Sequence, residues 1–265
     1  MMRNRLKDKK VLVTGASSGL GAELAWKLAE HGAVPLLAAR SADRLEKLSY
    51  RLENELGATS YTYPVDLTDQ EAVSSVMREI MDTHPVIDAL INNAGIGSFK
   101  WIEDMDMEEA AYMLELNVHS LIRVTKQLLP HLQKQGSGHI VNVASQAGKI
   151  ATPKSAVYAA SKHAVLGFTN ALRLEVQKKG IYVTAVNPGP VSTRFFDSAD
   201  PEGNYVESVQ RYMLEPGEVA EKVIKHLFTK KREINMPWWM ETGSRLYSQF
   251  PDIMEKLLKS QFNRK

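Results

Sequence analysis

Short apolar segments alternate with longer amphipathic ones along most of this chain, and this alternation restricts the possible folds more than any other feature. Six apolar segments are each joined to the next by a helical pattern, at residues 10–15, 34–40, 59–66, 88–95, 138–145 and 181–189. Their continuous apolar runs are typical of strands that are covered on both faces of a parallel sheet. The pattern predicts an α/β fold with a doubly wound parallel sheet and helices on both faces.

The chain beyond residue 190 departs from this alternation. Residues 190–215 form an irregular stretch that is long enough to be a lid, and a helix over 217–230 and a short strand over 233–236 follow. The last strand brings the sheet to about seven strands. We therefore expect a single domain over residues 1–237, including a lid at about 190–215, and a C-terminal helical appendage over 238–265.

Composition excludes several classes of function. The net charge of +2 and the lack of a basic stripe argue against a nucleic-acid partner. The chain has no Cys, and its seven His show no ligand spacing, so we expect neither thiolate chemistry nor a metal site. No apolar run approaches the ~18 residues of a membrane span. The charged start does not read as a signal peptide, so we expect a soluble, cytoplasmic protein.

A glycine-rich loop, "TGASSGLG" at residues 14–21, lies between the first strand and the first helix. Its glycines, Gly15, Gly19 and Gly21, permit a tight turn, close approach to a phosphate and close helix packing. The helix start then offers free N–H groups to a pyrophosphate. The plainer alternative is a helix that is merely capped by Ser17 or Ser18.

The end of the second strand, about 20 residues past such a loop, usually contacts the adenosine ribose of a dinucleotide. Here Ala39 stands where an acidic residue would serve NAD, and Arg40 follows it. A guanidinium suits a 2′-phosphate, so the sequence favours NADP(H) over NAD(H). Alternatively, Arg40 is a surface residue at the start of a helix.

The G-x-x-x-G-x-G spacing resembles that of the short-chain dehydrogenase/reductase family, and the resemblance extends over roughly residues 10–193. It implies a Rossmann fold and an oxidoreductase that uses a nicotinamide cofactor. "VDLT" would place Asp66 at the adenine amino group, although Asp66 could instead cap the next helix. "NNAG" at 92–95 would lie under the cofactor, and Thr193 in "NPGPVST" would bind the nicotinamide carboxamide. The full expected cofactor set is Gly15, Ser17, Ser18, Gly19, Leu20, Gly21, Arg40, Asp66, Leu67, Asn93, Ala94, Gly95, Tyr158, Lys162, Pro188, Gly189, Val191 and Thr193.

The same resemblance points to four residues for acid–base catalysis: Asn117, Ser145, Tyr158 and Lys162. Tyr158 and Lys162 share a helix face in "YAASK", so the ammonium is expected to lower the pKa of the phenol. Ser145, at the end of a strand, can polarise a carbonyl oxygen, and Lys162 can also bind the nicotinamide ribose. By resemblance, Asn117 holds a water that leads from the lysine to solvent; otherwise it is an ordinary buried Asn.

The substrate is not readable from the sequence, but the two segments expected near it carry aromatic residues. Those of the lid, Phe195, Phe196, Tyr205 and Tyr212 together with Met213, indicate either an apolar substrate or simple packing of the loop. The appendage begins with Trp238 and Trp239 and continues as an apolar stripe that Pro251 interrupts, which predicts two short helices. It would dock on its own domain or a partner subunit, cover the substrate site, or lie on a membrane.

These observations together predict an NADP(H)-dependent oxidoreductase that interconverts a carbonyl and an alcohol, with Tyr158 as general acid/base. One alternative is a catalytically silent nucleotide-sensing or interaction protein of the same fold. A narrower enzyme hypothesis is a 3-oxoacyl thioester reductase. The resemblance also implies a homodimer or homotetramer.

Overall fold

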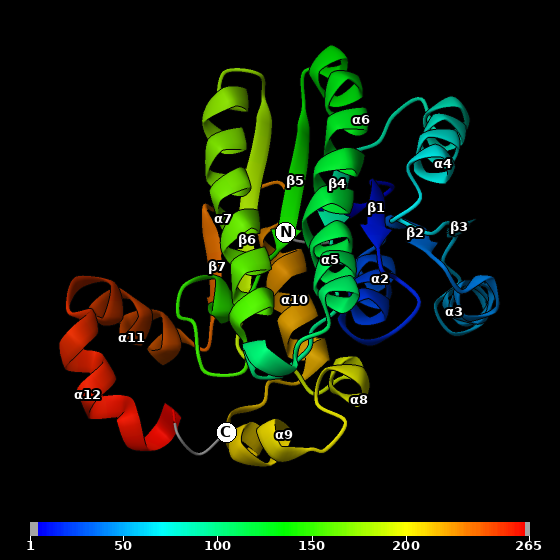
Figure 1. The fold of residues 1–265 in the computed structure, drawn as a ribbon. Coiled ribbons are helices and arrows are strands. Elements are labelled where there is room, and N and C mark those ends of the chain that lie inside the picture. Colours follow the sequence, from blue (N-terminus) through cyan, green and yellow to red (C-terminus); the bar gives the residue numbers. More distant parts are fainter. Residues whose placement is uncertain (1–4, 263–265) are drawn as a thin grey trace.

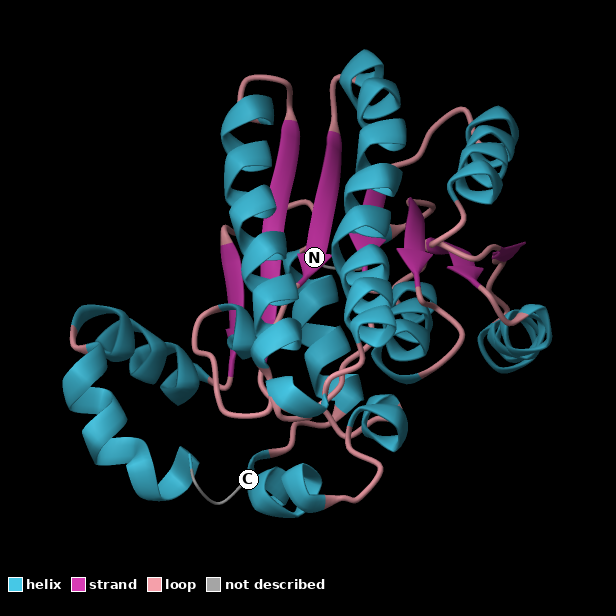
Figure 2. Ribbon diagram, in the orientation of Figure 1, coloured by secondary structure: helices cyan, strands magenta, loops and turns pink. Residues whose placement is uncertain are grey.

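Seven parallel strands form one sheet in the order β3-β2-β1-β4-β5-β6-β7 within residues 5–262, the part of the chain that this computed structural model describes. The strand order reverses direction between β1 and β4, which leaves a crevice at the carboxyl ends of these strands. The predicted doubly wound sheet of about seven strands is confirmed (Figures 1 and 2). The strands are β1 (Lys10–Thr14), β2 (Val34–Ala39), β3 (Tyr61–Pro64), β4 (Ala89–Asn92), β5 (Gly138–Val143), β6 (Ile181–Pro188) and β7 (Glu233–Met236).

Both faces of the sheet are covered by helices, and successive residues of a strand point into the two different cores. In β1, Val11 and Val13 contact the core on one face, whereas Leu12 contacts the core on the other. This arrangement explains why the strands are continuously apolar. Helices α2 (Gly19–Glu30), α3 (Ala42–Leu56) and α10 (Pro216–His226) cover the first face, and α4 (Gln70–Thr83), α6 (Ser120–Gln135) and α7 (Ala156–Val176) cover the second.

The helical stretch over residues 107–135 is interrupted. Helix α5 (Met107–Leu114) and helix α6 are joined by a π-helical turn, Glu115–His119, that contains Asn117. A π turn widens the backbone by one residue and often lies at functional sites. Here it directs the Asn117 side chain into the protein, where 1% of the residue is exposed.

The lid and the appendage are both helical. The lid contains α8 (Phe195–Ala199), α9 (Asn204–Val209) and a 3₁₀ turn, Gln210–Tyr212. The appendage contains α11 (Trp238–Gln249) and α12 (Pro251–Phe262), with Pro251 as the first residue of α12, and its last residues, 263–265, lie outside the described part. Figure 1 shows these two helices extending from the β7 edge of the sheet.

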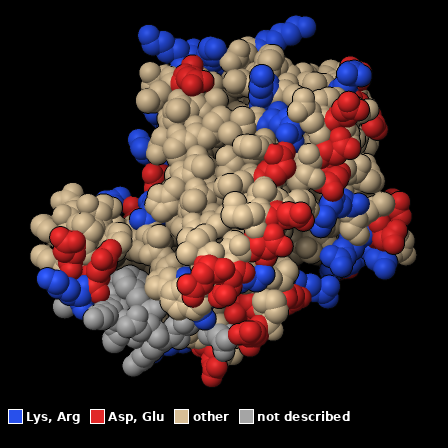
Figure 3. All heavy atoms as spheres, in the orientation of Figure 1, with Lys and Arg blue, Asp and Glu red and all other residues tan. Residues whose placement is uncertain are grey.

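Charged side chains are unevenly distributed over the surface. Figure 3 shows a broad area over α6 and α7 with few charged groups, and Lys, Arg, Asp and Glu side chains interspersed around it. Exposed apolar residues on α5 and α7 include Leu114 and Leu174. Among residues 5–262, none of the helices has the length and apolar character required to cross a bilayer.

Candidate active site

A cavity of about 1360 Å³ opens at the carboxyl ends of the strands and extends from β2 to the lid. Every residue expected to bind the cofactor lines it, as do Ser145, Tyr158 and Lys162. Asn117 does not line it, because its side chain is buried behind the cavity wall. Residues that are far apart in the sequence therefore meet at the edge where the resemblance expects them.

The glycine loop brings α2 close to the end of β1. A Cβ on Gly21 would lie 2.1 Å from the Gly15 carbonyl oxygen, so a larger residue would separate the helix from the loop. Gly15 and Gly19 have φ angles of +67° and +52°, which L side chains rarely adopt. Ser18 occupies the N-cap position of α2, but its side chain makes no capping hydrogen bond. Capping by the Ser18 side chain therefore does not determine the conformation of this loop.

The "NNAG" segment is attached to the glycine loop by direct hydrogen bonds. Thr14 Oγ1 accepts from the Asn93 N–H (3.0 Å) and the Ala94 N–H (3.2 Å), while Asn93 Nδ2 donates to the Thr14 carbonyl (3.1 Å). Asn92 is fully buried and donates to Thr125 and Asn142. The two segments thus form one rigid floor between β1 and β4.

The end of the cavity beside β2 and β3 carries both positive and negative groups. Arg40 is exposed, and one of its guanidinium nitrogens donates to the Tyr112 hydroxyl (2.9 Å). Ser41 and Arg44 line the same end, and sequence reasoning missed both; a second Arg one helical turn after Arg40 was the available signal. This end can hold an anionic group through two guanidinium groups and a hydroxyl.

Asp66 lines the cavity together with these residues, and it does not cap a helix. Its carboxylate accepts from the N–H and the hydroxyl of Thr68, whereas Asp69 caps α4 by accepting from the backbone of Glu71 and Ala72. Burial raises the pKa of Asp66, but the two bonds from Thr68 and the charge of Arg40 outweigh it, so the pKa lies below its ordinary value. Asp66 is therefore ionised and able to accept from a ligand.

Ser145, Tyr158 and Lys162 come together where β5 and α7 meet. Ser145 follows β5, its Oγ accepts from the Ala147 N–H (3.1 Å), and it donates to the Pro188 carbonyl (3.4 Å). Tyr158 and Lys162 lie one turn apart in α7, at 9% and 5% exposure. The Lys162 ammonium donates to the Val143 carbonyl (3.1 Å) and lies 5.7 Å from the centre of the Tyr158 ring.

The pKa values of this pair correct the sequence-based expectation. Burial raises the pKa of Tyr158 to about 12, and the hydrogen bond with Ser145 opposes this shift only in part. Burial lowers the pKa of Lys162 to about 8. The ammonium did not lower the pKa of the phenol as expected, because it faces the ring and a backbone carbonyl, so desolvation dominates both groups.

Asn117 links the cavity floor to the helix that carries Tyr158 and Lys162. Its Nδ2 donates to the Ile96 carbonyl (2.9 Å) and to Ser161 Oγ (3.0 Å), and its Oδ1 accepts from the Ile96 N–H (2.8 Å). Ser161 directly precedes Lys162 and donates to the Tyr158 carbonyl (2.7 Å). The side chain is thus a buried, hydrogen-bonded Asn, as in the plainer hypothesis, and it holds the turn that carries both catalytic candidates.

The start of the lid closes over the glycine loop. A Cβ on Gly19 would lie 3.2 Å from the Cβ of Thr193, so the two segments are in direct contact across the cavity. Thr193 Oγ1 makes only weak local hydrogen bonds, to Val191 and Phe195 at 3.4 and 3.3 Å. It is therefore available to a ligand that lies between the loop and the lid.

Aromatic residues of the lid surround Tyr158. The ring of Phe195 lies 5.7 Å from that of Tyr158, and Phe99, which sequence reasoning missed, lies 5.8 Å from it. Tyr205 stacks on Phe99 with ring centres 4.4 Å apart. The rings attach the lid to the domain, which the packing hypothesis expects, and they also line the cavity, where an apolar substrate stays a prediction. Among the described residues, the structure groups no three His, Asp or Glu side chains as a metal site.

Comparison with known proteins supports the same assignment. The model of the family described as short chain dehydrogenase matches residues 9–203. An uncharacterized oxidoreductase of Staphylococcus saprophyticus is 35% identical over 219 residues, which cover 83% of this chain and 91% of that protein.

Two solved structures bind different cofactors. A short-chain dehydrogenase from Sphingobium yanoikuyae in complex with NADPH has a TM-score of 0.80 and 28% identity, with 92% of this chain and 96% of that chain covered. A short-chain dehydrogenase/reductase from Burkholderia phymatum in complex with NAD has a TM-score of 0.85 at 22% identity, covers 94% and 95% of the two chains, and supports the fold alone. The match over most of the chain, together with the geometry of the cavity, establishes that this chain belongs to the short-chain dehydrogenase family of oxidoreductases acting on CH–OH groups.

Proposed function

We propose that this protein is an NADP(H)-dependent oxidoreductase that interconverts a carbonyl compound and an alcohol, with Tyr158 as the general acid/base. The observation that carries the proposal is the convergence of Ser145, Tyr158 and Lys162 in one cavity with the glycine loop. The catalytic domain would span residues 1–237, with the lid at 190–215 and the appendage at 238–265. We also propose that the protein is cytoplasmic.

The cavity fits a nicotinamide dinucleotide at several independent points. The glycine loop and the start of α2 present backbone N–H groups to a pyrophosphate, and Gly21 leaves no room for a Cβ. Asp66 and Thr193 both line the cavity, and they would bind an adenine amino group and a carboxamide respectively. When bound, the cofactor supplies or accepts the hydride at the carbonyl carbon.

Preference for the phosphorylated cofactor rests on the residues at the end of β2. Ala39 offers no carboxylate to a ribose 2′-hydroxyl, whereas Arg40, Ser41 and Arg44 line the cavity at this end. Two guanidinium groups would neutralise a 2′-phosphate and donate to it. This part of the proposal would be wrong if Arg40 stayed on the Tyr112 hydroxyl when the cofactor is bound.

Ser145 and Tyr158 would both act at the carbonyl oxygen. Ser145 would donate a hydrogen bond that polarises the carbonyl, and the phenol of Tyr158, kept protonated by burial, would transfer its proton to the oxygen as the alcohol forms. In the reverse direction the phenolate of Tyr158 would accept the proton, and the hydrogen bond with Ser145 is the contact that favours this form. Lys162 would also bind the nicotinamide ribose.

Asn117 would act through its neighbours rather than on the substrate. Its bonds to Ile96 and Ser161 hold the α7 turn of Tyr158 and Lys162 against the cavity floor. We retain the proposal that the π turn around Asn117 also anchors a water that leads from Lys162 to solvent. Replacing Asn117 should therefore disturb the catalytic pair without opening the cofactor site.

We further propose that the protein forms a homodimer or homotetramer. The weakly charged area over α6 and α7 in Figure 3 and the exposed Leu174 of α7 favour contact between copies there. Sedimentation of the full chain would test this, and a monomer at all concentrations would contradict it.

The cofactor proposal is tested by following NADPH oxidation against a panel of carbonyl compounds, with NADH as the comparison. Arg40→Ala and Arg44→Ala should each reduce kcat/KM for NADPH about tenfold to a hundredfold, because each removes a charged hydrogen bond to phosphate. Activity with NADH should change little. Arg51→Ala is the control, because Arg51 pairs with Glu55 on the outer face of α3. Equal use of NADH and NADPH by the unaltered protein would overturn the preference.

A further inference from the structure

The side of the cavity away from the glycine loop is bounded by α11, a helix that the βα pattern does not require. Trp239 and Met240, its second and third residues, line the cavity. Their neighbour Trp238 does not line it and is 76% exposed. Adjacent helical residues point about 100° apart, so the two tryptophans face different environments.

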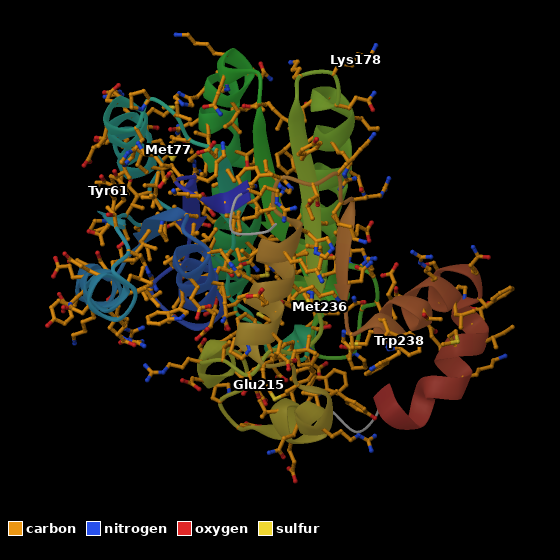
Figure 4. The ribbon with its side chains drawn as sticks, turned by 180° about the vertical axis from the view of Figure 1, so that it is seen from behind. Tyr61, Met77, Lys178, Glu215, Met236 and Trp238 are labelled. Atoms are coloured by element: carbon orange, nitrogen blue, oxygen red, sulfur yellow. The ribbon has the colours of Figure 1, made fainter. Side chains whose placement is uncertain are left out.

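Close packing fixes the position of these two residues against the lid and β6. A Cβ on Gly189, the residue after β6, would lie 2.8 Å from the Met240 sulfur. The ring of Trp239 lies 5.3 Å from that of Tyr212 in the lid, at an angle of 60°. Figure 4 shows Trp238 beside Met236 at the lower end of the sheet, with Glu215, the last lid residue, at the same end. The helix therefore begins where β6, β7 and the lid converge.

An ion-pair cluster attaches α11 to the turn that carries Ser145. Lys149 follows this turn, and its ammonium contacts Glu233 of β7 (2.6 Å) and Glu241 of α11 (2.5 Å). It also donates to Asn235 Oδ1 (3.2 Å), and its side chain is only 16% exposed. Partly buried charges that are paired on two sides hold their geometry more firmly than surface pairs do. Glu241 directly follows Met240, so the cluster sets the distance between Ser145 and the wall.

We propose that Trp239 and Met240, positioned by the Lys149–Glu241 pair, form the specificity-determining wall of the substrate site and select carbonyl compounds with an aromatic or fused-ring body. This inference rests on the proposed function and names its substrate class. The same cavity is lined by a second set of rings, Phe99 and Phe195, which flank Tyr158. A flat apolar molecule between the two sets would contact aromatic surface on both sides while its carbonyl meets Ser145.

Two polar donors in this part of the cavity are already engaged within the protein, whereas Gln146 Oε1 is buried without a partner among the described residues. Ser155 Oγ donates to the Thr152 carbonyl (2.7 Å), and Gln146 Nε2 donates to the Asn187 carbonyl (2.9 Å). The charged lid residues that line the cavity, Arg194 and Arg211 among them, are exposed and therefore lie at its mouth. A sugar would leave several hydroxyl groups against rings and a thioether, which costs hydrogen bonds that water otherwise makes.

The test compares Trp239→Ala with Trp238→Ala, a matched substitution one residue away that does not reach the cavity. Each variant and the unaltered protein would be assayed for kcat/KM with a naphthyl ketone, a small aliphatic ketone and a ketose. Binding of 2-naphthol in the presence of NADP would be measured by calorimetry, which requires no turnover. Glu241→Gln probes the ion pair, because Glu241 contacts Lys149 but does not line the cavity.

We expect Trp239→Ala to lower kcat/KM for the naphthyl ketone and the affinity for 2-naphthol by about tenfold or more, with the aliphatic ketone little affected. Glu241→Gln should shift both quantities in the same direction by a smaller factor, and Trp238→Ala should match the unaltered protein. Equal effects of the two tryptophan substitutions on 2-naphthol binding, or a preference for the ketose, would overturn the proposal. If no carbonyl compound is reduced but 2-naphthol binding depends on Trp239, the proposed reaction is wrong. The proposal that Trp239 forms a wall of the binding site is then still supported.

Discussion

Replacing Lys162 by Met should stabilise the folded protein at neutral pH while removing the ammonium that we propose takes part in catalysis. Burial lowers the pKa of Lys162 from 10.5 to about 8. Each pKa unit corresponds to 1.36 kcal/mol, so holding the ammonium in the folded state costs roughly 3 kcal/mol. Loss of the hydrogen bond to the Val143 carbonyl offsets about 1 kcal/mol of the gain. Because Met fills a similar volume, we expect a net increase in the free energy of unfolding of about 2 kcal/mol.

The sign of the pH dependence follows from the lowered pKa. Below pH 8 the lysine is charged in both the folded and the unfolded chain, so the folded protein bears the full free-energy cost of burying the ammonium. Between pH 8 and 10.5 the folded protein loses this proton first, and the unaltered protein gains stability relative to the variant. The advantage of Lys162→Met should therefore fall by roughly 2 kcal/mol between pH 7 and pH 10, to near zero.

Urea unfolding at pH 7 and pH 10 measures this difference directly. Lys126→Met, on the exposed face of α6, is the matched control and should differ little from the unaltered protein at either pH. The reasoning would be refuted if Lys162→Met were no more stable than the unaltered protein at pH 7, or if its advantage were the same at both pH values.

Three further predictions concern the cofactor loop, the pH profile and the appendage. Gly21→Ala should weaken NADPH binding by roughly tenfold or more, because its Cβ would lie 2.1 Å from the Gly15 oxygen. Gly167→Ala is the control and should bind NADPH normally, because a Cβ there would meet nothing within 4 Å. Equal affinities of the two variants in fluorescence titrations would contradict this prediction. For carbonyl reduction, kcat/KM should fall above about pH 8, because Lys162 loses its proton there while Tyr158, with a pKa of about 12, stays protonated. A kcat/KM that is constant up to pH 10 would argue against a role for the ammonium. In flotation with anionic vesicles the full chain should remain unbound, because α11 turns Trp239 and Met240 toward its own domain. If the full chain floats with the vesicles and Trp238→Ser abolishes this binding, the result would favour the membrane hypothesis instead.

The sheet and the floor of the site were predictable because they depend on local patterns. Continuous apolar runs marked the strands, and Ser145 stood at a strand end, where parallel sheets place functional residues. The π turn was signalled only indirectly, by an Asn within an apolar helical stretch. Its bonds to Ile96 and Ser161 join segments that the sequence separates, so their geometry could not be read in advance.

The substrate side was much less predictable, because it depends on contacts between distant segments. The Lys149–Glu241 pair joins residues 92 positions apart, and helical periodicity alone cannot tell which of two adjacent tryptophans faces the cavity. The pKa of Tyr158 was expected to fall from its spacing to Lys162, but burial, which spacing does not reveal, raised it. Phe99 was missed because its role follows from the position of the lid.

The central claim is that Tyr158 transfers the proton while the rest of the cavity binds the cofactor, and Tyr158→Phe tests it most directly. This substitution removes only the hydroxyl group and keeps the ring contacts with Phe99 and Phe195. NADPH binding and carbonyl reduction would be measured on the same preparation. The account predicts near-normal NADPH affinity with a loss of turnover of about a hundredfold or more. Turnover close to that of the unaltered protein would contradict the assignment of Tyr158.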